Sequence, residues 1–123
     1  MKFSIALLLT IFFCVQLKAQ TIQPEIKNAK PDSTQKIIVV EASCGQCKFG
    51  MPGKGCNLAV RINGKSYFVD GADIDSFGDA HSHDGFCEAI RTAEVQGEII
   101  NNIFMATYFK LLPAAEKNIP TGK

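Results

Sequence analysis

The sequence predicts a small, mainly β domain with one short helix, arranged as a five-stranded OB-like barrel. Three observations carry this prediction: short β-branched runs, two asparagine turns of the hairpin type, and one helical apolar period between the third and fourth strands. A helix between the third and fourth of five strands is the element order of the OB fold. A small open α+β sheet is the alternative arrangement of the same elements.

The first three strands are expected at residues 37–40, 57–62 and 65–70. The first run, Ile-Ile-Val-Val, is short and β-branched, which favours a strand over a helix. The second run alternates, and its apolar residues share one face: Leu58, Val60 and Ile62. Asn63-Gly64 then predicts a tight hairpin to the third strand, because both turn positions require positive φ.

A short helix is expected at residues 85–93, with Asp84 as its N-cap. Its apolar residues recur at spacings of three and four and so share one face: Phe86, Ala89, Ile90 and Ala93. The last two strands are expected at residues 94–100 and 103–112. They are joined at Asn101-Asn102, and asparagine tolerates the left-handed conformation that a tight turn needs.

Residues 1–19 have the layout of a secretory signal peptide. A positive start precedes an apolar run at residues 5–15, and the small residue Ala19 precedes the expected cut. The run is shorter than the roughly 20 residues of a membrane span. We therefore expect a periplasmic or secreted protein with no membrane span in its mature chain. Cys14 would leave with the leader.

The remaining chain divides into three parts. Residues 20–36 are expected to form a flexible linker, residues 37–112 a single domain, and residues 113–123 a disordered tail. Loss of the leader leaves 11 basic residues against 12 acidic ones, and no long basic run remains. A nucleic acid or an anionic membrane surface would require a concentrated positive face. The composition therefore argues against both as partners.

Four cysteines remain in the predicted domain: Cys44, Cys47, Cys56 and Cys87. The first two form a Cys-x-x-Cys knuckle, in which two side chains on a tight turn can meet one tetrahedral ion. The other two arrive from separate elements, so the set fits a four-cysteine zinc site. Copper is the second metal considered, with Met51 as a soft neighbour. His81 is a candidate to replace one sulfur or to add a ligand.

Two other interpretations of the cysteines stay open. An exported domain with an even number of cysteines is typical of a disulfide-stapled module that binds a protein partner in the periplasm. Cys44 and Cys47 would then each bond a different partner, Cys56 or Cys87. A Cys-x-x-Cys pair also occurs in thiol redox enzymes at the start of a helix. Glycines and a proline after Cys47 predict that no helix continues there. Because no acid–base or nucleophile set accompanies the cysteines, a non-catalytic binding protein is the leading interpretation.

Three short runs resemble high-potential iron–sulfur proteins, which are small exported electron carriers. The runs are Cys44-x2-Cys47-x-Phe49, Gly55-Cys56-x-Leu58 and Gly85-Phe86-Cys87-x-Ala89. The resemblance implies that the four cysteines bind a [4Fe–4S] cluster and transfer electrons. This chain departs from that family in two ways: it has no tryptophan, and its start has no twin-arginine pair. We therefore expect zinc or copper rather than an iron–sulfur cluster.

A longer resemblance covers residues 42–112. It is to a bacterial family of small exported domains of unknown function, and it is carried by these runs: Cys44-Gly45-Gln46-Cys47, Gly55-Cys56, Tyr67-Phe68-Val69-Asp70-Gly71, Gly78-Asp79-Ala80-His81 and Asp84-Gly85-Phe86-Cys87. The resemblance implies export and a single domain. It implies no reaction.

Overall fold

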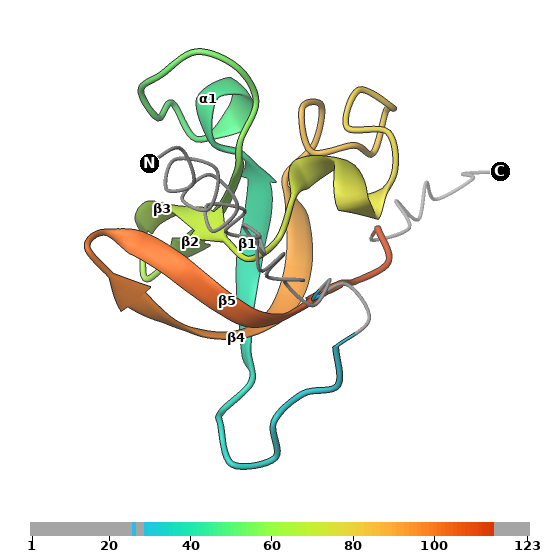
Figure 1. Cartoon of the computed structure of the whole chain (residues 1–123). Coiled ribbons are helices and arrows are strands. Elements are labelled where there is room, and N and C mark those ends of the chain that lie inside the picture. Colours follow the sequence, from blue (N-terminus) through green and yellow to red (C-terminus); the bar gives the residue numbers. More distant parts are fainter. Residues whose placement is uncertain (1–25, 27–28, 115–123) are drawn as a thin grey trace, which may run out of the picture.

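The protein is a closed five-stranded barrel (Figure 1). The computed structural model describes residue 26 and residues 29–114, so the signal-peptide prediction lies outside the described residues. The strands are β1 (Ile38–Cys44), β2 (Leu58–Ile62), β3 (Lys65–Asp70), β4 (Arg91–Ile100) and β5 (Ile103–Leu111). Their order around the barrel is β1-β2-β3-β5-β4. The predicted OB-like barrel is thus confirmed, in place of an open sheet.

The barrel is closed by the pairing of β1 with β4 and of β3 with β5. β1 is antiparallel to both β2 and β4, so that Glu41 lies opposite Arg61 on one side and Thr92 on the other. The pairing of β3 with β5 is parallel and completes the ring. Closure leaves none of the five strands with a free edge, which removes the usual template for strand-to-strand aggregation.

The two predicted hairpin turns are confirmed. Asn63 and Gly64 have φ values of 51° and 80°, and Asn101 and Asn102 have φ values of 50° and 64°. Positive φ at both central residues is the type I′ geometry, whose twist matches that of the flanking strands. The first turn sets the β2–β3 register, with Ile62 opposite Lys65, and the second sets Ile100 opposite Ile103.

Apolar side chains from all parts of the barrel fill its interior. Phe104 and Phe109 on β5 are buried, and two alanines of the core, Ala42 and Ala93, have no exposed surface. Phe77 closes one end, with its ring centroid 4.9 Å from that of Phe109 and 5.9 Å from that of Phe86. The segment between β3 and β4 therefore covers an end of the core.

The helices differ from the prediction in position. The helix expected at residues 85–93 is not formed: the chain makes one turn, in which the amides of Glu88 and Ala89 both donate to Gly85 O, and β4 begins at Arg91. Pairing with β1 takes up residues 91–93 and outweighs their helical period. The helices described are a 3₁₀ turn, η2 (Ile74–Phe77), and one turn of α-helix, α1 (Gly45–Lys48).

α1 ends at Lys48, the residue after Cys47. Gly50 takes a φ of 65°, so the helix does not continue, in agreement with the expectation from the sequence. In the part of the chain that is described, no helix has the length and apolar character to cross a membrane.

The residues before β1 lie against the barrel. Gln96 on β4 is 1% exposed, and its side-chain amide accepts a hydrogen bond from Asp32 N and donates to Asp32 O and Gln35 O, each at 2.8 Å. Figure 1 shows this N-terminal segment at the end of the barrel away from α1. One buried amide therefore fixes the described part of the segment in which the sequence predicts a linker.

Candidate metal centre

Four cysteines from four parts of the chain converge at one end of the barrel. Cys44 is the last residue of β1, Cys47 lies in α1, Cys56 precedes β2, and Cys87 precedes β4. All four Sγ atoms lie within 4.8 Å of one another. In a tetrahedral site with metal–sulfur bonds of 2.3 Å, the sulfurs lie about 3.8 Å apart. The four sulfurs are therefore within reach of a single ion.

Cys56 is tied to the knuckle through its neighbour Asn57. Gly45 N donates to Asn57 O at 2.8 Å, and the Gln46 side chain pairs with Asn57 twice: Oε1 accepts from Asn57 N at 2.9 Å, and Nε2 donates to Asn57 Oδ1 at 2.7 Å. Three hydrogen bonds thus hold the segment before β2 against α1. They set the backbone on both sides of the site, as outer-shell groups do at metal centres.

Gly45 is the residue that lets α1 approach the barrel so closely. A Cβ at this position would lie 2.7 Å from Phe68 Cε1, 2.9 Å from Met51 Sδ and 3.1 Å from Ala59 Cβ. The carbonyl of Gly45 also accepts from the amides of Phe49 and Met51. The glycine between the first two cysteines therefore serves packing rather than a left-handed turn.

Cys87 is positioned by contacts between its loop and β1. Cys44 N donates to Phe86 O at 2.9 Å, and Cys87 N donates to Ala80 O at 2.8 Å. The buried hydroxyl of Ser43 lies 2.6 Å from Phe86 O and 2.9 Å from Ala89 O. The backbone on each side of Cys87 is therefore fixed to the strand that carries Cys44.

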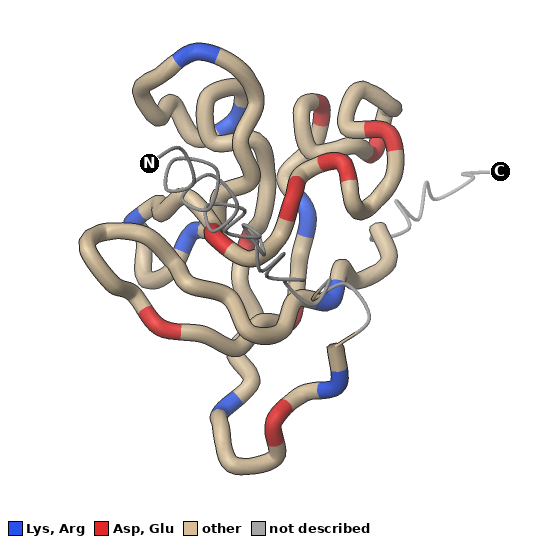
Figure 2. Tube along the Cα trace, in the orientation of Figure 1, with Lys and Arg blue, Asp and Glu red and all other residues tan. Residues whose placement is uncertain are grey.

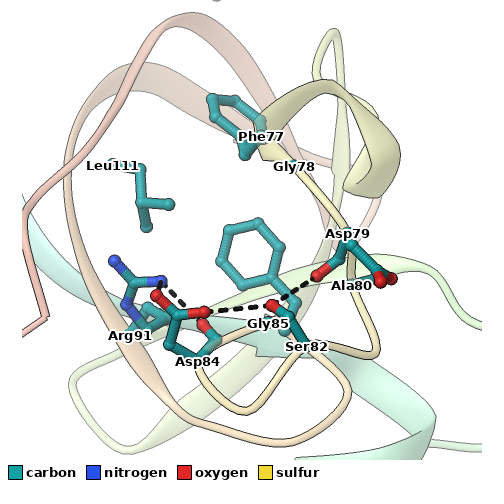
Figure 3. A pocket seen from close by; sticks show the side chains of 10 residues that line it. Phe77, Gly78, Asp79, Ala80, Ser82, Asp84, Gly85, Arg91 and Leu111 are labelled. Carbon is teal, nitrogen blue, oxygen red and sulfur yellow. Dashed lines mark hydrogen bonds and ion pairs between the residues drawn. The ribbon is translucent and has the colours of Figure 1, made fainter.

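A polar network stabilises the same loop from its outer side (Figure 3). Arg91 Nη1 donates to Asp84 O at 2.6 Å, and Nη2 donates to Leu112 O at 3.0 Å. Ser82 Oγ lies 3.0 Å from Asp84 Oδ1. Together with Phe77, Phe86 and Leu111, these side chains line a cavity of about 130 Å³. The network links the loop before Cys87 to the end of β5.

The four sulfurs differ in exposure. Cys44 is fully buried, Cys87 is 8% exposed, Cys56 is partly exposed, and Cys47 is exposed. The site is thus closed toward the core and open toward solvent at Cys47. The amide of Cys47 donates to Cys44 Sγ at 3.4 Å, so the first cysteine also caps α1.

The thiols perturb one another. Burial alone would raise the pKa of Cys44, but hydrogen bonds from Cys56 Sγ and the Cys47 amide outweigh it and lower that pKa. The pKa of Cys56 is raised by burial and by its hydrogen bonds to Cys44 and Cys87. The pKa of Cys47 is raised chiefly by its interaction with Cys44. A thiolate is thus favoured at Cys44 and a neutral thiol at Cys47 and Cys56, because negative sulfurs this close repel one another.

His81 is not brought into this group. The residues whose donor atoms lie within 4.8 Å of one another are the four cysteines alone, within the described ranges. The His81 side chain is 76% exposed, and its Nδ1 lies 3.9 Å from Asp79 Oδ1. The structure therefore places this predicted additional ligand on the surface of the β3–β4 segment.

Charged residues are distributed differently over the two connections that build the site. Figure 2 shows acidic residues gathered along the segment between β3 and β4, whereas basic residues mark the loop around α1. In sequence these are Asp73, Asp75, Asp79 and Asp84 on one side and Lys48 and Lys54 on the other. The two segments that carry Cys47 and Cys87 thus differ in the sign of their charged residues.

Residues 38–112 match a family of unknown function, DUF6370. The chain belongs to this family. No curated protein and no solved structure matches the chain. The part of the chain that matches DUF6370 contains all five strands and all four cysteines of the site. Membership therefore defines the domain and agrees with the resemblance found over residues 42–112, and it assigns no activity.

Proposed function

We propose that this DUF6370 domain is a non-catalytic binding protein that holds one metal ion between its four cysteines. The observation that carries the proposal is the convergence of four Sγ atoms within 4.8 Å. A single tetrahedral ion requires this spacing, whereas a cluster that binds each cysteine to a different iron would hold the sulfurs further apart. The geometry therefore favours one ion over the iron–sulfur cluster.

A divalent cation would also offset the repulsion between neighbouring thiolates. The thiols can lose their protons together only if positive charge lies between them, because otherwise each thiolate opposes the ionisation of the next. Zinc is the first choice, since four cysteines in a closed tetrahedron are typical of structural zinc sites. Bound there, it would join β1, α1, the loop before β2 and the loop before β4.

Copper is the second metal. The thioether of Met51 packs beside the knuckle, 2.9 Å from where a Cβ on Gly45 would lie. Soft sulfur ligands select monovalent copper. A preference for copper would therefore depend on Met51, whereas zinc binding would not.

A disulfide-stapled module is the second candidate function. It is favoured by the separation of 2.7 Å between Cys44 Sγ and Cys56 Sγ. The predicted signal peptide at residues 1–19 also implies an oxidising compartment, in which disulfides persist. Export, and with it a protein partner in the periplasm, forms part of the proposal.

The test is a zinc titration of reduced, metal-free protein against a chromogenic chelator. We expect one zinc per chain in the wild type and in His81→Ala, and at least about 100-fold weaker binding in Cys44→Ser, which loses an inner ligand rather than an outer-shell group. Alkylation of chelator-treated protein should find four free thiols. Absence of stoichiometric zinc, together with no free thiols before reduction, would overturn the metal proposal in favour of disulfides.

Export is tested separately. Intact-mass measurement of protein from fractionated cells should find a chain that begins at Gln20 in the exported fraction. A chain that retains residues 1–19 in the cytoplasm would contradict this part of the proposal and leave the metal site untouched.

A further inference from the structure

The four sulfurs are not equally spaced. Cys44 Sγ and Cys56 Sγ are 2.7 Å apart, whereas the four Sγ atoms together lie within 4.8 Å of one another. The ligands of one tetrahedral ion lie about 3.8 Å apart, whereas a disulfide joins its sulfurs at about 2.0 Å. The Cys44–Cys56 pair is therefore closer than shared binding of an ion requires.

The backbone around this pair is fixed on both sides. Cys44 ends β1 opposite Leu58 at the start of β2, and Cys56 lies two residues before that partner. The hydrogen bonds of Asn57 to Gly45 and Gln46 hold the two segments together. Formation of a bond between the sulfurs requires side-chain movement of less than 1 Å and no break in the barrel.

We infer that the cysteine centre has two covalent states, and that a Cys44–Cys56 disulfide expels the metal ion. The inference rests on the proposed metal binding and adds its regulation. Among the three pairings that four cysteines allow, the geometry selects the one that contains Cys44–Cys56. Oxidation would thus convert the metal-binding form of the domain into a disulfide-stapled form, so the two candidate functions are two states of one site.

The oxidant is a small-molecule disulfide, such as glutathione disulfide. In the zinc-loaded form Cys56 is held as a thiolate, and its partly exposed sulfur attacks one oxidant sulfur, which forms a mixed disulfide and releases one small thiolate. The buried Cys44 thiolate then attacks Cys56 Sγ, which forms the Cys44–Cys56 bond and releases the second small thiolate. In total, two protein thiolates are oxidised and one disulfide is reduced to two thiolates. The ion loses two of its four ligands.

The remaining ligands cannot retain the ion. Cys47 is exposed on α1 and Cys87 lies in the loop before β4, so two thiolates and water would replace four thiolates. The barrel itself does not change, because its hydrogen-bonded strands do not depend on the pair. Oxidation should therefore lower zinc affinity by at least about 100-fold while the fold is kept.

The experiment treats the zinc-loaded protein with glutathione disulfide and follows two signals: zinc release by a colorimetric chelator, and disulfide identity by peptide mapping. We expect one zinc released per Cys44–Cys56 bond, and rebinding after reduction. A dominant Cys44–Cys47 bond, or zinc retained by protein in which Cys44–Cys56 is complete, would overturn the inference. Because peptide mapping uses the wild-type protein, its outcome does not depend on whether a variant folds.

Two variants separate this inference from the proposed function. Cys47→Ser removes a ligand but should still form the Cys44–Cys56 disulfide at a similar rate, whereas Cys56→Ser should not acquire the oxidant-induced bond to Cys44. If the wild type binds no zinc yet forms Cys44–Cys56, the proposed function fails and the pairing stands. If it binds one zinc but oxidation joins other cysteines, the regulation fails and the proposed function stands.

Discussion

Two single buried polar side chains each fix a loop to this barrel, and they differ in how completely they do so. Gln96 makes three hydrogen bonds of 2.8 Å to the N-terminal segment, and each uses a separate donor or acceptor. Ser43 lies within 2.9 Å of two carbonyls, those of Phe86 and Ala89, but a hydroxyl has one proton to donate. The Gln96 side chain therefore holds the N-terminal segment with three full hydrogen bonds, whereas Ser43 can give the loop beside Cys87 only one.

This difference indicates which region depends on the cysteine centre. The described part of the N-terminal segment lies at the end of the barrel away from α1, and none of the hydrogen bonds of residues 29–37 involves a cysteine. The loop before β4 carries Cys87 and shares its one hydroxyl between two carbonyls. A metal ion that joins Cys87 to Cys44 would supply the attachment that Ser43 provides only in part. Stability should thus depend on metal at one end of the molecule and not at the other.

Removal of the metal should change the difference in stability between the two ends of the barrel more than any substitution. With zinc at 1,000 times its Kd, binding stabilises the folded state by about 4 kcal/mol, and a chelator removes that contribution. Amide hydrogen exchange of residues 44–47 and 86–89 should then accelerate strongly, because their attachments to the ion are lost. The amide of Asp32, which donates to Gln96, should keep its protection. Uniform acceleration at both ends would show that the two regions are not independent.

Gln96→Ala should produce the next largest effect. Loss of three hydrogen bonds from a buried side-chain amide predicts a decrease of about 3 kcal/mol in the free energy of unfolding, measured by urea denaturation. Because Gln96 is remote from the sulfurs, zinc affinity should equal that of the wild type. The decrease should have the same size with and without zinc, since distant sites contribute additively.

Ser43→Ala tests the weaker attachment. The hydroxyl contributes one shared proton, and Phe86 O keeps its hydrogen bond from Cys44 N, so the cost should be about 1 kcal/mol. Unlike that of Gln96→Ala, this cost should be larger in the metal-free protein than in the zinc form, because the ion holds the same loop. Equal costs in the two forms would contradict a role of the metal in fixing this loop.

The fold was predictable because its determinants are local. Asn63-Gly64 and Asn101-Asn102 each encode a turn type in two residues, and alternation within β2 assigns Leu58 and Val60 to the core. It does not predict that Ala59, on the other face, is buried as well. The failed helix at residues 85–93 shows the limit of local patterns. Apolar spacing of three and four fits a helix in isolation, but the pairing of Val40 with Ala93 between the neighbouring strands β1 and β4 decides the outcome.

The clustering of the four cysteines was predictable, but the residues that support them were not. Four cysteines in so small a domain can be noticed without a structure, and the knuckle spacing indicates chelation. Ser43, Gln46 and Asn57 are common polar residues, and their roles arise from contacts made only after β1, β2 and the loop before β4 meet. Gln46 lies inside the knuckle, and that position was the one signal available. His81 was proposed from its closeness in sequence to Cys87, yet the loop directs it to solvent.

The smallest expected effect is on the loss of stability at acid pH, to which each of the two regions contributes one aspartate. The pKa of Asp32 is lowered chiefly by the Thr34 amide, with a further hydrogen bond from the Thr34 hydroxyl, and that of Asp84 chiefly by the Ser82 hydroxyl. A folded-state pKa below that of the unfolded chain adds stability above the unfolded value, near pH 4, and this stability is lost as pH falls through the folded value. Asp32→Asn and Asp84→Asn should each flatten the fall in melting temperature between about pH 5 and pH 2.

At neutral pH, Asp84→Asn should also weaken the loop beside Cys87. It should therefore lower the melting temperature of the metal-free form more than that of the zinc form, whereas Asp32→Asn should change both melting temperatures equally. An equal response of both variants to zinc would remove the distinction between the two ends of the barrel.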